Sequence, residues 1–195
     1  MRAIALLLAA TAAIAVTACD EEDELTGSPD PSKERSDRPT EPPTGWHTLA
    51  NRRAGFTLSV PPGWASRTRK SATLIRSNDR LVALTVAADR SETGRGTGPR
   101  QYARRTFKAL PGFRKLRSTP VRRVRGSPYR SARVDGGGTL ADRRQRQRIT
   151  VAAYHRPRRA TYTIVAFSAR VAGVPVHAGA LQTLLASLRA QRPRL

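Results

Sequence analysis

The sequence predicts an α+β fold, an antiparallel sheet flanked by helices, and three observations point to it. Short runs of alternating apolar and polar residues recur from residue 46 onward, separated by turn-forming residues. Two longer segments, 98–110 and 175–190, place their apolar residues at a helical spacing instead. Because the strands come in groups, rather than alternating one by one with helices, an antiparallel sheet is favoured over βαβ units.

The first group of strands follows Trp46. The segment GFTLSV at 55–60 alternates apolar and polar side chains with the period of a half-buried strand. The prolines of PPGW end this strand, because proline cannot donate a hydrogen bond to a ladder. Further strands are predicted at 72–75 and 81–88, with a turn at 77–80 between them.

The first helix is predicted over 98–110. Pro99 suits a first helical turn, and Pro111-Gly112 ends the helix. The residues that share one face of this helix are Ala103, Thr106, Phe107 and Leu110.

The second half of the domain is predicted to hold strands at 119–125, 129–134, 146–154 and 161–168. The last two are joined by RPRR, which is typical of a hairpin turn. The run DGGG at 135–138 predicts a turn or mobile loop. The chain is expected to close with the helix over 175–190, whose apolar stripe consists of Leu181, Leu184, Leu185 and Leu188.

Two stretches of this domain resemble a known family. AGFTLSVPPGW near its start and LLASLR in the closing helix are similar to the PsbP-like α/β/α sandwich. That fold is shared by the photosystem extrinsic protein PsbP, the Ran-binding Mog proteins and lipoproteins of the LpqN type. The resemblance covers residues 46–191 and implies a small, non-enzymatic binding or assembly domain. The family's metal and Ran contacts have no matching motif here.

Residues 1–18 have the pattern of a secretory signal. Met1-Arg2 is a short charged start, and AIALLLAATAAIAV is an uncharged run of 14 residues. A membrane-spanning helix needs about 20 apolar residues, so this run is too short to be one.

The chain's one cysteine follows this segment. Val16, Thr17, Ala18 and Cys19 resemble the lipobox of bacterial lipoproteins. The resemblance implies that the Cys19 sulfur carries a diacylglycerol and that Cys19 becomes the new N-terminus. The expected location is therefore the extracytoplasmic face of the cell membrane, where a lipid with two chains anchors a protein stably. The alternative is a plain secretory signal with Cys19 as a free thiol. With one cysteine, no internal disulfide can form.

Charge divides the remaining chain into two parts. Residues 20–45 hold nine acids, three basic residues, five prolines and one large apolar residue, Leu25, a net charge of −6. A segment of this composition cannot bury enough apolar surface to offset the conformational entropy that it would lose on folding. Residues 19–45 are therefore predicted to be a disordered acidic tether behind the acylated cysteine. Residues 46–195 form the basic α+β domain, with a net charge of +27 within a total of +22.

The basic charge suggests an anionic partner. Arg144, Arg146 and Arg148 fall on one side of a strand by period two, and three more arginines crowd the predicted hairpin tip, namely Arg156, Arg158 and Arg159. Arginine offers two parallel donors to phosphate or carboxylate. The candidate partners are anionic lipid, an envelope polymer, an acidic protein or the tether itself. Specific nucleic-acid binding is not expected, because aromatic residues make up only 5% of the chain.

A second interpretation of the charge is compositional. Only four of the 36 basic residues are lysines, as a GC-rich coding sequence would produce, so the arginines would then be a solvated surface. Codon bias does not explain why acids are scarce after residue 45.

Catalytic and metal-binding patterns are missing from the sequence. His47, His155 and His177 are not at a metal-ligand spacing, and the five acids of the domain form no paired-carboxylate motif. We therefore expect no catalytic residue, metal or cofactor, and a non-catalytic envelope binding module. The alternative is an envelope enzyme, or enzyme accessory, acting on a cell-wall polymer. Convergence of His155, His177 and either Asp135 or Asp142 in one cleft would favour the alternative.

Overall fold

The structure is a computed structural model, and it describes residues 43–140, 146–156, 159–171 and 174–191. In chain order the elements are β1 (His47–Asn51), β2 (Phe56–Val60), β3 (Ala65–Arg69), β4 (Ala72–Arg76), β5 (Val82–Asp89), α1 (Glu92–Gly96), α2 (Pro99–Lys108), β6 (Phe113–Ser118), β7 (Arg130–Leu140), β8 (Arg146–Arg156), β9 (Ala160–Ser168), β10 (Arg170–Val171), β11 (Val174–Pro175), α3 (Ala178–Ala186) and β12 (Arg189–Ala190). This is the α+β class that the sequence predicts.

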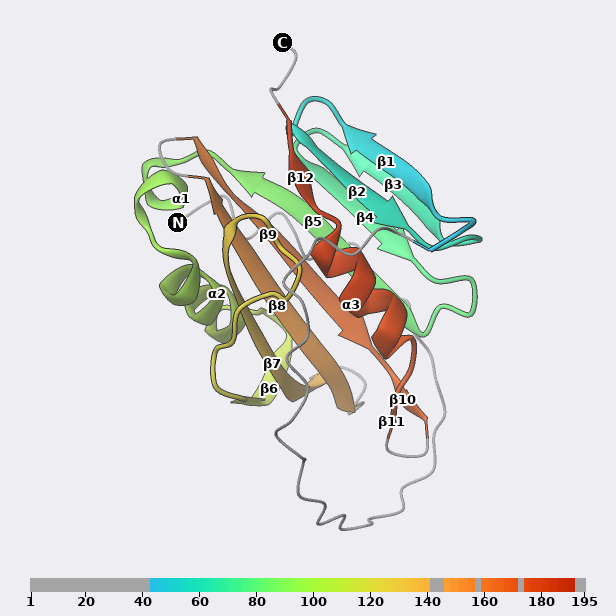
Figure 1. Ribbon diagram of the computed structural model, residues 1–195. Coiled ribbons are helices and arrows are strands. Elements are labelled where there is room, and N and C mark those ends of the chain that lie inside the picture. Colours follow the sequence, from blue (N-terminus) through green and yellow to red (C-terminus); the bar gives the residue numbers. More distant parts are fainter. Residues whose placement is uncertain (1–42, 141–145, 157–158, 172–173, 192–195) are drawn as a thin grey trace, which may run out of the picture.

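The described strands form two main antiparallel sheets. The larger has seven strands in the order β3-β4-β5-β9-β8-β7-β6, and the smaller has three in the order β1-β2-β12. A short β10–β11 pair stands apart from both. In Figure 1, α1 and α2 lie on one side of the large sheet, and α3 and the small sheet lie on the other. The large sheet is therefore the middle layer of three.

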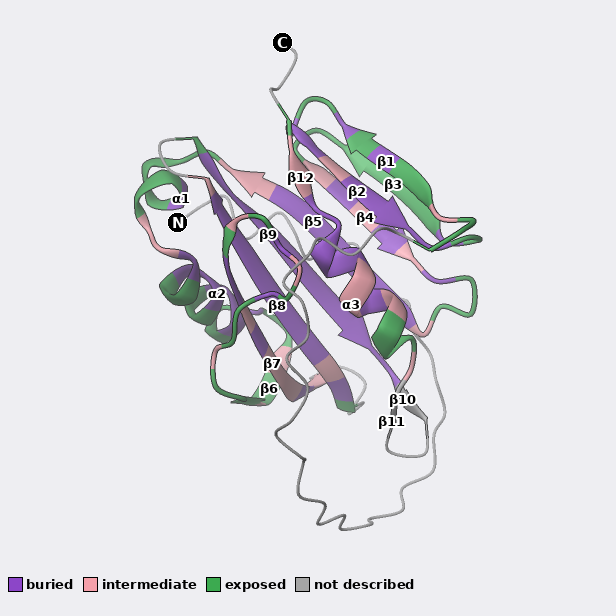
Figure 2. Cartoon of the chain, viewed as in Figure 1, coloured by how far each residue is buried: buried purple, intermediate pink, exposed green. Residues whose placement is uncertain are grey.

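Each face of the large sheet has its own core. Phe56, Leu84, Ile164 and the α3 leucines form the core beneath α3 and the small sheet. Tyr102 and Phe107 of α2 pack on the other face, against a second set of strand residues that includes Ile149, Val151 and Phe167. Covering on both faces explains why the central strands are apolar almost without a break. Figure 2 shows these central strands buried and β3 exposed along its length.

Most of the predicted elements are confirmed. The strands expected at 55–60, 72–75 and 81–88 are β2, β4 and β5, and the hairpin pair expected at 146–154 and 161–168 is the antiparallel pair β8–β9. The helix expected at 98–110 is α2, with Gly98 as its N-cap and Pro99 in its first turn.

The strand predicted at 119–125 is wrong. The edge strand β6 lies earlier, where Phe113 and Leu116 are half-buried against the core beneath α2. Pro120 interrupts the ladder, because proline has no N–H to donate. Beyond it, an isolated bridge joins Arg122 to Arg133 of β7.

The turn predicted at 135–138 is also wrong. Asp135 and the three glycines after it lie inside β7, a strand of 11 residues that pairs with β6 and β8. A Cβ on Gly136 would collide with the Arg117 carbonyl oxygen and would lie 2.5 Å from the Phe107 ring, and one on Gly138 would lie 2.8 Å from Leu116. These two glycines therefore allow close packing within a strand and do not mark a turn.

The closing helix is shorter than predicted. It runs from 178 to 186 instead of 175 to 190, and His177 precedes it in a left-handed conformation (φ 54°). After the helix the chain extends into β12, which pairs with β2. Leu188, expected on the helix, is fully buried just beyond it.

Several short elements have no counterpart in the sequence-based expectations. These are β1, β3, α1, β10, β11 and β12. None of the described helices has the length and apolarity to cross a bilayer.

Candidate functional site

A cavity of about 610 Å³ lies where β7 ends and β8 begins, beside the edge strand β6. We call it the β6–β8 cavity. Its wall contains four basic side chains and one acid, and these are Lys115, Arg117, Arg146, Arg148 and Asp135.

The floor of the β6–β8 cavity is a row of three residues across three strands. Gly137 of β7 is paired with Arg117 of β6 on one side and with Arg148 of β8 on the other. Paired residues point to the same face of a sheet, and neighbouring strands lie about 4.8 Å apart, so the two arginines stand roughly 10 Å apart across the glycine. Among the described residues, a Cβ on Gly137 would meet only the Gln147 carbonyl oxygen, at 3.5 Å. The described residues therefore leave the space above Gly137 open to a ligand.

Asp135 anchors the neighbouring row. Its Oδ1 accepts hydrogen bonds from Arg133 Nε (2.9 Å), Arg133 Nη2 (2.8 Å) and Thr150 Oγ1 (2.6 Å). Arg133 Nη1 also donates to Gln182 Oε1 of α3 at 2.6 Å, which ties the strand to the helix above it. Arg148 Nη2 lies 3.7 Å from the same carboxylate. Asp135 therefore neutralises the charge of Arg133 and attracts the guanidinium group of Arg148.

The remaining cavity charges are not neutralised within the described part of the chain. Lys115, Arg117 and Arg146 have no acidic partner among the described residues. Two of the other described acids are engaged elsewhere, since Asp79 pairs with His177 and Asp89 accepts the Tyr102 hydroxyl hydrogen bond at 2.7 Å. The cavity therefore presents an excess of positive charge in a concave site, where an anion can contact several donors at once.

The structure divides the arginines that the sequence groups together. Arg146 and Arg148 line the β6–β8 cavity, but Arg156 is ten residues further along β8 and Arg159 lies beyond it. At about 3.3 Å per residue, Arg156 lies roughly 26 Å from Arg148 and roughly 33 Å from Arg146 along the strand. The two groups of arginines therefore do not meet in one place, because the hairpin tip is at the far end of β8. Arg144 and Arg158 lie outside the described residues, as do Val16, Thr17, Ala18 and Cys19.

The histidines occupy three separate environments. His47 is exposed on β1. His155 is buried at the end of β8, where its Nδ1 lies 3.1 Å from Thr161 Oγ1, and burial together with the nearby Arg130 lowers its pKa. His177 Nε2 lies 2.6 Å from Asp79 Oδ2, and its ring meets Trp64 edge to face.

The Asp79 carboxylate is held in its charged form. Burial raises the pKa of Asp79, but hydrogen bonds from Ser77, the Leu81 amide and His177 outweigh it and lower the pKa to about 2. The convergence that would favour an enzyme is not seen among the described residues, since His155, His177 and Asp135 have different partners; Asp142 lies outside them. The described part of the chain contains no group of three or more histidine, cysteine or acidic side chains placed to hold a metal.

Sequence reasoning missed Lys115, Arg117 and Asp135 as cavity residues. The only signal lay outside the glycines: Val134 and Leu140 lie an even number of positions apart, which fits one continuous strand, whereas the glycines themselves favour a turn. Continuing that strand would have brought β6 and its basic residues alongside.

Comparisons with known proteins support the fold. The sequence matches no protein-family model and no curated protein. The structure is similar to a crystal structure of a protein from Bacteroides thetaiotaomicron, with a TM-score of 0.51 and 11% sequence identity over 76% of this chain. The match spans about half (49%) of that protein's chain. At this identity, the similarity concerns the fold alone.

Proposed function

We propose that this protein is a non-catalytic binding module of the cell envelope, held on the extracytoplasmic face of the membrane by a diacylglycerol on Cys19. Its PsbP-like domain would bind an anionic partner through the β6–β8 cavity. The observation that carries the proposal is the row Arg117–Gly137–Arg148, in which an arginine is paired with the glycine on each side and all three residues line the β6–β8 cavity.

The two arginines beside Gly137 favour phosphate or carboxylate as the bound group. A guanidinium group donates two parallel hydrogen bonds to either anion, and hydrogen bonds between charged groups are about twice as strong as neutral ones. Arg146 and Lys115 add charge at the rim, and Asp135 fixes the side chains behind it. Because the partner would displace counterions and water from exposed cations, the affinity should fall as salt rises.

The binding test uses the chain from residue 20, which lacks the signal and Cys19. It is titrated with inorganic polyphosphate, anionic vesicles and neutral vesicles, each at low and at physiological salt. We expect binding to at least one of the anionic probes, reduced by salt, and no binding to neutral vesicles. The deciding variant is Gly137→Leu, whose side chain fills the space above residue 137 without removing any charge. Gly137→Ala is its matched control. Affinity that is indifferent both to salt and to the Gly137→Leu substitution would contradict the proposal.

The anchor is tested separately in the full chain. Cys19→Ala should remain unprocessed, whereas the mature wild-type protein should partition into detergent with an acylated cysteine at its N-terminus. Mass spectrometry of that N-terminus decides the matter. A mature chain that starts elsewhere, or one with an unmodified thiol at Cys19, would contradict the lipid anchor and leave the binding proposal to its own test.

A further inference from the structure

A second basic cavity lies at the other end of β7, beside the first turn of α2. It has a volume of about 730 Å³ and is lined by four arginines, Arg100, Arg122, Arg123 and Arg130. We call it the α2–β7 cavity. Like the β6–β8 cavity, it combines several guanidinium groups in a concave site, and no acid lines it among the described residues.

Two further polar features line this cavity. The first turn of α2 contributes Gly98, Pro99 and Arg100, and its N-cap is a glycine, which has no side chain to cap the helix amides. Ser131 also lines the cavity; it is 9% exposed, and its hydroxyl has no hydrogen-bond partner among the described residues. Helix N-terminal amides and a serine hydroxyl both donate to anions.

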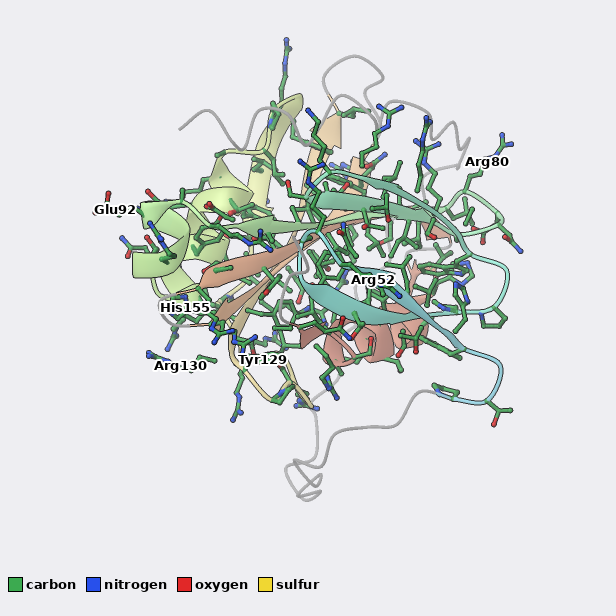
Figure 3. All side chains as sticks on the ribbon, turned by 90° about the horizontal axis from the view of Figure 1, so that it is seen from above. Arg52, Arg80, Glu92, Tyr129, Arg130 and His155 are labelled. Carbon is green, nitrogen blue, oxygen red and sulfur yellow. The ribbon has the colours of Figure 1, made fainter. Side chains whose placement is uncertain are left out.

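The two cavities are lined by neighbouring stretches of the same two segments, although no residue lines both. The chain lines the β6–β8 cavity with residues 117–119 and then the α2–β7 cavity with residues 121–123. Strand β7 runs past both, with Arg130 and Ser131 at one cavity and Asp135 to Thr139 at the other. Ser131 and Gly137 are six residues apart on this strand, which corresponds to about 20 Å. Figure 3 shows Tyr129 and Arg130 close to His155, at the end of β7 that lines the α2–β7 cavity.

We infer that the anionic partner is a linear polymer with a repeated anionic group, which occupies both cavities at once along the segment from Lys115 to Arg123. This inference rests on the proposed function and names the class of its partner. A flexible chain can enter two concave sites in succession. A flat bilayer surface reaches only their rims, and a small anion fills one of them. Linking two sites through one ligand makes the second contact intramolecular, which raises affinity by about 10² or more.

The experiment measures affinity against ligand length. The chain from residue 20 is titrated with pyrophosphate, tripolyphosphate and long-chain polyphosphate, and with anionic vesicles as a flat surface. Three double variants each remove two positive charges. They are Arg117→Gln with Arg146→Gln in the β6–β8 cavity, Arg100→Gln with Arg130→Gln in the α2–β7 cavity, and Arg67→Gln with Arg69→Gln on the exposed edge strand β3.

For the wild-type chain we expect long-chain polyphosphate to bind about 100-fold more tightly than tripolyphosphate, expressed per ligand end, and more tightly than vesicles. Each cavity variant should lose about tenfold or more of the long-chain affinity, and the β3 variant less than threefold. Thermal melts show whether each variant is folded, and the single substitutions replace any double variant that is not.

The outcomes separate the inference from the proposed function. Salt-dependent binding that does not depend on chain length, or equal losses in all three variants, would overturn the linear polymer and leave a general anion site. Tighter binding to vesicles than to long-chain polyphosphate would identify a membrane surface instead and overturn the inference. If no anionic probe binds in a salt-dependent way, the proposed function fails together with it.

Discussion

In the middle of the β7–β8 pair, Val134 faces Val151 and both are buried; nearer the point where β7 ends and β8 begins, Gly137 faces Arg148 and the pair floors a cavity. We call the part of the pair from Val134 to the end of β8 the packed end and the part around Gly137 the open end. Arg156 lies on the packed end, and Arg146 and Arg148 lie on the open end. The difference lies in side-chain volume and in what covers the sheet. Arg156 lines neither of the two described cavities, whereas Arg148 lies beside Gly137 and borders a space that a ligand can enter.

The glycines of the open end give the sharpest test of this difference. Gly136→Ala should destabilise the fold by about 3 kcal/mol, because its Cβ would collide with the Arg117 carbonyl and the Phe107 ring. Thermal unfolding should show a melting temperature lower by about 10 °C. Gly137→Ala is the matched control: its Cβ would lie 3.5 Å from the Gln147 oxygen, so stability should change by less than about 1 kcal/mol. Equal effects at the two positions would mean that the strand does not alternate between a packed face and an open one.

A smaller effect distinguishes the arginines of the two ends. The pair Arg146→Gln and Arg148→Gln should weaken tripolyphosphate binding about tenfold, equivalent to about 1.4 kcal/mol. The pair Arg156→Gln and Arg159→Gln removes the same charge from the other end and should cost less than threefold, because these residues do not line the β6–β8 cavity. Isothermal titration at low salt measures both. Similar losses would show that net charge, and not the cavity, governs the affinity.

The smallest predicted effect concerns the packed end and its pH dependence. His155 is buried with a pKa below its ordinary 6.5, so the unfolded chain binds its proton more readily than the folded chain does. The contribution of His155 to stability is therefore complete above about 6.5 and is lost as the pH falls toward the lowered folded pKa. His155→Gln should reduce the loss of melting temperature over this range, and His47→Gln, an exposed position, should not. A wild-type stability that stays constant below pH 6.5 would argue that His155 is not buried in the neutral form.

The packed regions were predictable because their signal is local. Alternating or continuous apolar runs located β2, β4, β5, β8 and β9, and helical spacing located α2. Each of these patterns is complete within about ten consecutive residues. The open end held no such signal, since glycine has no side chain to alternate and its turn preference was the only local information at 136–138.

By itself, the sequence determined the α+β class, the antiparallel grouping of strands, the basic charge of the domain and the position of its one cysteine behind an apolar segment. Only the tertiary structure decided that Asp135 to Gly138 continue a strand, because the Phe107 ring and the Arg117 carbonyl of other elements occupy the space that a side chain at Gly136 would need. It also decided that the closing helix ends at Ala186, where the chain leaves to pair with β2. The two cavities depend on the same kind of contact between distant segments, and such contacts leave no periodic trace in the sequence.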